Sequence, residues 1–154
     1  MTNVLFVCHG NICRSPMAEF VMKDLVARAG VADDFFIASA ATSTEEIGNP
    51  VYPPARRELA RHGIDCAGKR AVQLRKGDYA KYDYLLGADS RNITNMLRIV
   101  GRDPAHKICR LLDFTDHPRD IADPWYTGDF QRTWDDVVEG CTALLAHLGY
   151  EIPR

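Results

Sequence analysis

The residues best suited to chemistry lie near the start of the chain, where five residues separate Cys8 from Arg14 and Ser15 follows directly. A loop that curls ahead of a helix can turn its backbone N–H groups inward and bind a phosphate-like anion. Arg14 can bind two phosphoryl oxygens with its planar guanidinium group. Such an electropositive hollow favours a thiolate at Cys8, with Ser15 able to hydrogen-bond the sulfur. The spacing therefore predicts a cysteine nucleophile in a phosphate-binding loop.

The residues inside this loop have their own expected roles. Gly10 and Asn11 are the two best able to adopt left-handed backbone angles. His9 is expected to touch the substrate or tune the charge of the pocket, with a solvated bystander as the alternative. The alternative for Cys8 is a buried structural cysteine, which the neighbouring Arg14 argues against. The full set of expected phosphate-binding residues is His9, Gly10, Asn11, Ile12, Cys13 and Ser15.

The elements around the loop alternate between strand and helix. An apolar strand at 3–7 precedes the loop, and Ser15-Pro16 is expected to begin a helix with Ser15 as N-cap and Pro16 as first helical residue. This alternation predicts a parallel sheet with ligands beyond the carboxyl ends of its strands. Further strands are expected at 35–39, 82–86 and 107–112, and helices at 55–62, 90–100 and 130–148, with a Pro/Gly-rich loop at 42–54.

Length and composition limit the class of protein. The 154 residues predict one α/β domain over 1–154, large enough to bury its own core. A net charge of -2 gives no bulk electrostatic reason to expect a nucleic-acid or membrane partner. The five scattered cysteines, with neither a signal peptide nor a membrane-length apolar run, favour a reducing cytoplasm with a functional thiol. Export by a route that needs no signal peptide stays open, and we expect a monomer, with a weak dimer as the alternative.

The segment VLFVCHGNICRSPMAEF at 4–20 closely resembles the active-site segment of the low-molecular-weight protein tyrosine phosphatases. The resemblance continues through segments at 39–43, 48–50, 61–64 and 82–84 and ends with Asp-Pro-Trp-Tyr at 123–126, so it covers most of the chain. It implies a single-domain α/β/α fold with a central four-stranded parallel sheet. It also implies a two-step hydrolysis of phosphotyrosine in proteins, through a phosphocysteine on Cys8 and without cofactor or metal.

Such a reaction needs a group that protonates the leaving phenolate and later activates water. Asp123 is the best candidate, because the resemblance aligns it with the acid of the family and Pro124 holds its backbone extended. Asp103 also precedes a proline, and Asp120 and Asp129 are nearby alternatives. By the same resemblance, two aromatic residues look like walls of a slot for a phenyl ring rather than core residues; they are Trp125 and Tyr126.

Several supporting roles come from the resemblance alone. Asn11 and Ser39 match positions that brace the loop, although Ser39 fits a simple strand end nearly as well. Asp89 matches a supporting acidic position, with an N-cap of the helix at 90–100 as an equal alternative. Cys13 matches the partner of a reversible disulfide with the nucleophile. A zinc site is the competing idea for these two cysteines, but no second Cys/His pair has suitable spacing.

The sequence departs from the family pattern at a few positions. Glu45 stands where many relatives carry an aromatic residue, which places a negative charge near the pocket mouth and is expected to disfavour acidic phosphopeptides. Lys69 and Val72 replace the usual His and Arg, which puts that part of the loop support in doubt.

Three alternative functions remain open. Related phosphoarginine phosphatases carry Thr at the position of Ile12, so Ile12 favours phosphotyrosine. Related arsenate reductases need a thiol relay, whereas Cys66, Cys109 and Cys141 have the pattern of core residues. A non-catalytic phosphotyrosine-binding or redox-sensing module would be indicated by a missing nucleophile, arginine or acid, and all three are present.

Overall fold

A computed structural model describes residues 1–152, and in that range four parallel strands form one sheet in the order β2-β1-β3-β4. In register, Val4 of β1 lies between Ile37 of β2 and Tyr84 of β3. The strands are short and mostly buried, as expected of a parallel sheet that is covered on both faces. Their bounds are Thr2–Cys8 (β1), Phe35–Ala41 (β2), Tyr84–Gly87 (β3) and Ile108–Arg110 (β4).

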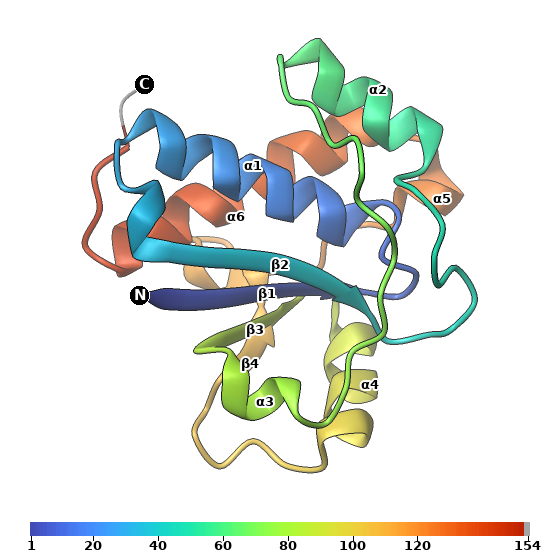
Figure 1. The fold of residues 1–154 in the computed structure, drawn as a ribbon, viewed down its shortest axis with the longest axis vertical. Helices are drawn as coiled ribbons and strands as arrows, with labels where there is room; N and C mark the ends of the chain where they lie inside the picture. Colours follow the sequence, from blue (N-terminus) through green and yellow to red (C-terminus); the bar gives the residue numbers. More distant parts are fainter. Residues whose placement is uncertain (153–154) are drawn as a thin grey trace.

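Helices cover both faces of this sheet (Figure 1). Helices α1 (Arg14–Arg28), α2 (Pro53–Arg61) and α6 (Phe130–His147) lie on one face, and α3 (Asp78–Lys81) and α4 (Ser90–Val100) on the other. Short turns complete the described chain: η1 (Ala32–Asp34), η2 (Leu111–Phe114) and α5 (Pro124–Thr127). The predicted α/β/α architecture with a four-stranded parallel sheet is confirmed.

Side chains of β1 point alternately to the two faces of the sheet and contribute to a separate hydrophobic cluster on each face. Val4, Phe6 and Cys8 belong to the cluster formed with α1 and α6, whereas Leu5 and Val7 belong to the cluster formed with α4. Successive side chains of a strand point to opposite faces, so a continuous apolar run serves both layers. The last residue of this strand, Cys8, is thereby fixed at the carboxyl edge of the sheet.

The start of α1 differs from the prediction. The helix begins at Arg14, with Cys13 before it and no side-chain cap among the described residues, so Ser15 and Pro16 are its second and third residues. Ser15 does not cap the helix because its hydroxyl bonds to two side chains in the loop instead. In the first turn the Ser15 N–H points at Cys8 Sγ and the Met17 N–H donates to the Cys13 carbonyl, so this end of the helix faces the Cys8 sulfur.

Two predicted strands are also shorter or shifted. The strand expected at 82–86 is β3, which begins at Tyr84, because Tyr82 directly follows α3 and packs into the core. The strand expected at 107–112 ends at Arg110, and Leu111 and Leu112 form a buried 3-10 turn under α6. An apolar run alone does not distinguish a strand from such a turn.

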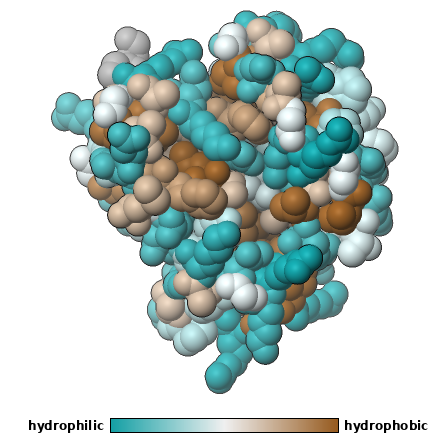
Figure 2. All heavy atoms as spheres, viewed as in Figure 1, coloured by the Kyte–Doolittle hydropathy of each residue, from teal (hydrophilic) through white to brown (hydrophobic). Residues whose placement is uncertain are grey.

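The surface seen in Figure 2 shows apolar residues in separate clusters between polar ones. Within residues 1–152, none of the helices combines the length and the hydropathy that crossing a bilayer requires.

Candidate active site

A pocket of about 360 Å³ lies at the carboxyl end of β1, where the chain order places β2 and β3 on opposite sides. Ligands of open α/β sheets bind at such switch points. Residues of the loop after β1 line it together with residues at the start of α5 and in the segment that carries Glu45. Its lining residues are Cys8, His9, Gly10, Ile12, Cys13, Arg14, Glu45, Glu46, Asp123, Trp125 and Tyr126.

The sulfur of Cys8 is held from the side of the helix. Its Sγ lies 3.0 Å from Ser15 Oγ and accepts a longer hydrogen bond, 3.4 Å, from the Ser15 backbone N–H. The residue is 3% exposed, so only its pocket side is open. The hydroxyl and the backbone N–H of Ser15 thus fix the position of this sulfur at the floor of the pocket.

Asn11 stabilises the loop through hydrogen bonds of its side-chain amide. It adopts a left-handed conformation with φ 58°, as predicted, and its Nδ2 donates to Ser15 Oγ at 2.7 Å and to Ser39 Oγ at 2.9 Å. The backbone N–H of Val72 donates to Asn11 Oδ1 at 3.1 Å, which fixes the orientation of the amide. Because Ser15 Oγ accepts from Asn11, its own hydrogen is left to point at Cys8.

Of the two loop residues best able to adopt left-handed angles, only Asn11 does so, and Gly10 has no positive φ. A Cβ built on Gly10 would lie 3.3 Å from Glu46 Cγ. The glycine therefore permits a close approach between the loop and the segment that carries Glu45 and Glu46.

Arg14 is buried and held by three partners. Its Nη1 donates to Asp89 Oδ2 at 2.6 Å and to the Ile121 carbonyl at 2.9 Å, and its Nη2 contacts Asp123 Oδ2 at 3.3 Å. Burial opposes the charged form, but the interactions with Cys8, Asp89 and Asp123 outweigh it and raise the pKa of Arg14. The guanidinium group is thus fixed as a cation in the pocket that contains Cys8.

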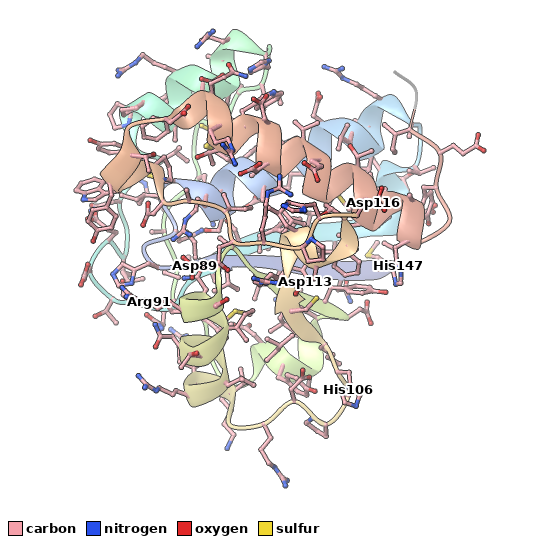
Figure 3. The ribbon with its side chains drawn as sticks, turned by 180° about the vertical axis from the view of Figure 1, so that it is seen from behind. Asp89, Arg91, His106, Asp113, Asp116 and His147 are labelled. Atoms are coloured by element: carbon pink, nitrogen blue, oxygen red, sulfur yellow. The ribbon has the colours of Figure 1, made fainter. Side chains whose placement is uncertain are left out.

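Asp89 fulfils both of its expected roles. Its Oδ2 binds Arg14, while its Oδ1 accepts from the Asn92 backbone N–H at 2.8 Å and caps α4. Figure 3 shows Asp89 at the end of α4 that lies near the sheet. The supporting role and the cap were alternatives in the sequence, and the two carboxylate oxygens accommodate both.

Asp123 begins α5 and faces the pocket. Its backbone is extended (φ -78°, ψ 113°), as Pro124 requires, and its Oδ1 accepts from the Trp125 N–H at 3.0 Å. Trp125 and Tyr126 are 53% and 85% exposed, and both line the pocket. Trp125 packs against Tyr52, with ring centroids 4.8 Å apart, a support that the sequence did not indicate.

The other aspartates considered for the acid have structural partners. Asp120 binds Ser90 and Arg110, and Asp129 caps α6. Asp103 accepts from Tyr79 and from the backbone N–H groups of Lys107 and Ile108 at the start of β4. Figure 3 shows His106, in the same loop as Asp103, far from Asp89.

Cys13 and Ile12 form the apolar side of the loop together with Ala71. Burial, and then the charge of Cys8, raises the pKa of the Cys13 thiol, so this second cysteine is a neutral thiol. Ile12 is 8% exposed and lines the pocket. The two cysteines of the loop therefore differ in environment.

The mouth of the pocket carries charge. His9 Nε2 and Glu45 Oε2 lie 3.1 Å apart, and both side chains are largely exposed. Glu46 lines the same side. These carboxylates make the rim acidic around an electropositive floor.

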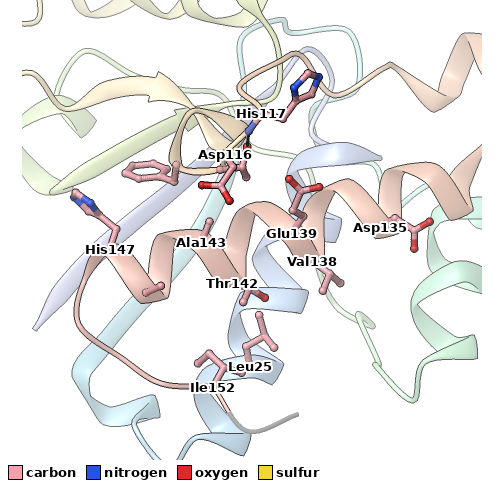
Figure 4. Close-up of a pocket in the computed structure, with 13 residues that line it drawn as sticks. Leu25, Asp116, His117, Asp135, Val138, Glu139, Thr142, Ala143, His147 and Ile152 are labelled. Atoms are coloured by element: carbon pink, nitrogen blue, oxygen red, sulfur yellow. Dashed lines mark hydrogen bonds between the residues drawn. The ribbon is translucent and has the colours of Figure 1, made fainter.

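A larger cavity, about 960 Å³, lies between α6 and the turn after η2 (Figure 4). Its described lining includes neither a cysteine nor an arginine. Figure 4 shows Asp116 and Glu139 facing it from opposite sides. We therefore take the smaller pocket at Cys8 as the candidate active site, because its lining contains a cysteine, an arginine and an aspartate.

The comparisons with known proteins agree with this geometry. A family model described as low molecular weight phosphotyrosine protein phosphatase matches residues 3–154. The low molecular weight protein-tyrosine-phosphatase YfkJ of Bacillus subtilis is 38% identical over 98% of each chain. The crystal structure of YfkJ matches with a TM-score of 0.92 and covers 97% of this chain and 95% of the YfkJ chain. The human low molecular weight phosphotyrosine protein phosphatase is 38% identical over 93% of each. A Drosophila arginine phosphatase structure, 26% identical, matches with a TM-score of 0.87 over 98% and 99%.

Proposed function

Because the chain belongs to the low molecular weight phosphotyrosine protein phosphatase family, whose members are hydrolases, we propose that it hydrolyses phosphotyrosine in proteins through a phosphocysteine on Cys8. The observation that carries the proposal is that Asp123, more than a hundred residues further along the chain, lies in one pocket with Cys8 and Arg14 of the loop after β1. A nucleophile, an anion clamp and a proton donor are together what this reaction needs.

In the first step Arg14 and the loop N–H groups bind the phosphoryl oxygens, and Cys8 Sγ attacks phosphorus. The P–S bond forms as the P–O bond to the tyrosine ring breaks. Asp123, as a carboxylic acid, gives its proton to the leaving phenolate oxygen. Its Oδ1 bond to the Trp125 N–H keeps the carboxyl group aimed at the pocket during this transfer.

In the second step water attacks phosphorus and the P–S bond breaks. Asp123, now a carboxylate, takes a proton from that water, as microscopic reversibility of its first role requires. The departing Cys8 thiolate accepts the hydrogen bond of Ser15 Oγ, 3.0 Å away, which stabilises it as a leaving group. No cofactor takes part in either step.

Phosphotyrosine is proposed over phosphoarginine because of the groups that line the pocket. Ile12 offers no hydroxyl to a guanidinium-linked phosphate. Trp125 and Tyr126 offer flat apolar surfaces at the mouth, suited to a phenyl ring. We further propose that the enzyme acts as a monomer on cytoplasmic phosphoproteins, and that the acidic rim disfavours acidic phosphopeptides.

Cys13 supports a second proposal about the same loop. A peroxide would transfer one oxygen atom to the Cys8 sulfur and be reduced to water or an alcohol, which leaves a sulfenic acid. The Cys13 sulfur would then attack the Cys8 sulfur, and the sulfenic hydroxyl would leave as water with the proton of the Cys13 thiol, forming a disulfide. This disulfide would protect the nucleophile from irreversible oxidation until a thiol reduces it.

The test is hydrolysis of phosphotyrosine and of p-nitrophenyl phosphate by wild type, Cys8→Ser and Asp123→Ala. We expect Cys8→Ser to abolish turnover and Asp123→Ala to lose roughly 10²–10⁴-fold. The loss in Asp123→Ala should be larger for phosphotyrosine, whose leaving group is more basic and depends more on a proton donor. Phosphoarginine is assayed beside phosphotyrosine to decide the substrate.

Two matched controls lie outside the pocket. Cys109→Ser replaces a half-buried thiol, and Asp103→Asn replaces the other aspartate that precedes a proline. Both should retain wild-type kcat/KM. Turnover by Cys8→Ser at the wild-type rate would refute the mechanism, and preference for phosphoarginine would refute the substrate.

A further inference from the structure

The segment that carries Asp123 has few polar contacts with the rest of the molecule. Among the described residues, the hydrogen bonds of residues 123–129 stay within the segment or run to the first turn of α6, except for the one from Arg14 to Asp123. Pro124 is buried at the start of α5, but Trp125 is 53% exposed. Beyond the contact with Arg14, side-chain packing must therefore hold this segment beside the pocket.

The ring of Tyr52 packs against this segment. Its centroid lies 4.8 Å from that of Trp125 and 6.1 Å from that of Phe130, with interplanar angles of 50° and 36°. Trp125 belongs to α5 and Phe130 begins α6, so one ring supports the segment near both of its ends. Tilted aromatic rings at these separations attract each other in addition to the apolar area that they bury.

Tyr52 is itself held in place. Its backbone N–H donates to the Ile12 carbonyl at 2.9 Å, and its carbonyl accepts from the Arg56 N–H at 3.0 Å in the first turn of α2. The buried Val51 precedes it, and Pro53, the first residue of α2, follows it. Figure 1 shows the start of α2 beside α5, which is where the two rings meet.

The backbone of Trp125 in turn orients the acid. Its N–H donates to Asp123 Oδ1 at 3.0 Å, and both residues line the pocket. Tyr52 is not among the described residues that line the pocket, so its effect on the reaction has to pass through Trp125. Proton transfer depends on placement, since a shift of about 1 Å can cost on the order of 10²-fold in rate.

We propose that Tyr52 is a positioning residue for the phosphatase reaction: its ring holds Trp125, and through the Trp125 N–H it keeps Asp123 where it protonates the leaving oxygen. This role rests on the proposed function of Cys8 and Asp123. Trp125 then has two tasks, because the residue proposed to line the slot for the phenyl ring also fixes the acid beside that slot.

The test compares kcat/KM for phosphotyrosine with kcat/KM for 2,4-dinitrophenyl phosphate, whose leaving group departs as an anion and needs no proton. A damaged slot for the phenyl ring lowers both values, whereas a displaced acid lowers only the first. In Tyr52→Leu we expect the ratio of the first value to the second to fall roughly tenfold. Tyr52→Phe should keep the wild-type ratio, because it keeps the ring.

Fluorescence anisotropy reports on the Trp125 indole directly. The chain has two tryptophans, so Trp134→Phe leaves Trp125 as the only one. In that background Tyr52→Leu should lower the anisotropy, because the indole loses the ring against which it packs.

Tyr150→Leu is the matched control. It removes a ring that packs on Phe35 with the centroids 5.1 Å apart. Phe35 begins β2 and pairs with Thr2, whereas the pocket lies at the other end of the same strands, where Cys8 pairs with Ala41. Tyr150→Leu should therefore change neither the ratio nor the anisotropy.

A double-mutant cycle tests the route through Trp125. Trp125→Leu removes the same contact from its exposed side, and it should lower the ratio as Tyr52→Leu does. The double variant should have no lower ratio than Trp125→Leu alone, because the two residues act as one contact. Losses that multiply in the double variant would overturn this route.

Thermal unfolding identifies variants that fail to fold, and if Tyr52→Leu is one of them, Trp125→Leu decides. A ratio within about threefold of wild type in either folded variant would overturn the role of Tyr52. Anisotropy requires no phosphatase activity, so the two proposals fail separately. If wild type hydrolyses no phosphotyrosine, the proposed function is wrong. If it does so and the ratio in Tyr52→Leu is that of wild type, only the role of Tyr52 is wrong.

Discussion

Replacement of Asp89 by asparagine tests how Arg14 is held. Asp89 uses one oxygen for Arg14, at 2.6 Å, and the other for the Asn92 N–H, at 2.8 Å. Asparagine has a single oxygen, so its NH₂ group must face one of these two donors. Because asparagine is as good an N-cap as aspartate, we expect the oxygen to stay at the cap and the NH₂ group to face Arg14.

Arg14 then loses a charge-assisted hydrogen bond, worth about 1.5–3 kcal/mol. Since about 1.4 kcal/mol corresponds to a factor of ten, kcat/KM should fall roughly 10- to 150-fold. The Ile121 carbonyl still binds Nη1, so the guanidinium group stays in the pocket and some activity remains. The melting temperature should change little, because the cap of α4 is kept.

The assay is kcat/KM for p-nitrophenyl phosphate with thermal unfolding in parallel. Asp120→Asn is the control, because Asp120 is half-exposed and binds Ser90 and Arg110 rather than Arg14. It should lose no more than a few-fold. If Asp89→Asn keeps kcat/KM within threefold of wild type and its melting temperature is unchanged, the two Asp89 oxygens do not have the separate roles inferred for them, one holding Arg14 and the other capping α4.

Two further variants test the fold. Three hydrogen bonds outweigh burial and lower the pKa of Asp103, so the Asp103 carboxylate stabilises the fold at neutral pH and loses this effect as the pH falls through its pKa in the folded protein. In urea unfolding, Asp103→Asn should be about 1–2 kcal/mol less stable than wild type at pH 7, and the difference should vanish in acid. A difference in stability that does not depend on pH would contradict this. A Cβ at Gly140 would lie 2.5 Å from Leu111 Cγ, so Gly140→Ala should cost about 1–3 kcal/mol, while Gly77→Ala, with open space around it, should cost nothing; equal melting temperatures for the two would contradict the packing.

The sequence predicts the loop well because all its parts are local. A strand, a cysteine, an arginine and a helix follow one another within 28 residues, so their arrangement depends little on the rest of the chain. The error at Ser15 has a physical reason: N-cap preference assumes a hydroxyl that is free to bind the helix, and here it bonds to Cys8 and Asn11.

Contacts between residues far apart in the sequence cannot be predicted from local sequence patterns. Only the resemblance indicates Asp123, because its loop and Cys8 are brought together by the fold alone. Nothing local indicates that the Ile121 carbonyl binds Arg14, or that Glu19 is buried on a helix where a glutamate is ordinarily solvated. The departure at Lys69 was visible, but its meaning depends on finding Glu19 beside it.

Three carboxylates around the pocket each divide their two oxygens between different partners. Asp89 binds a helix start and Arg14, Asp123 binds a helix start and Arg14, and Glu19 binds Ser39 and Lys23. An amide has one acceptor oxygen and can keep only one of the two bonds. The start of α4 and that of α5 are therefore tied to the arginine that would bind phosphate, and an amide at either aspartate can keep the helix cap or the contact with Arg14 but not both.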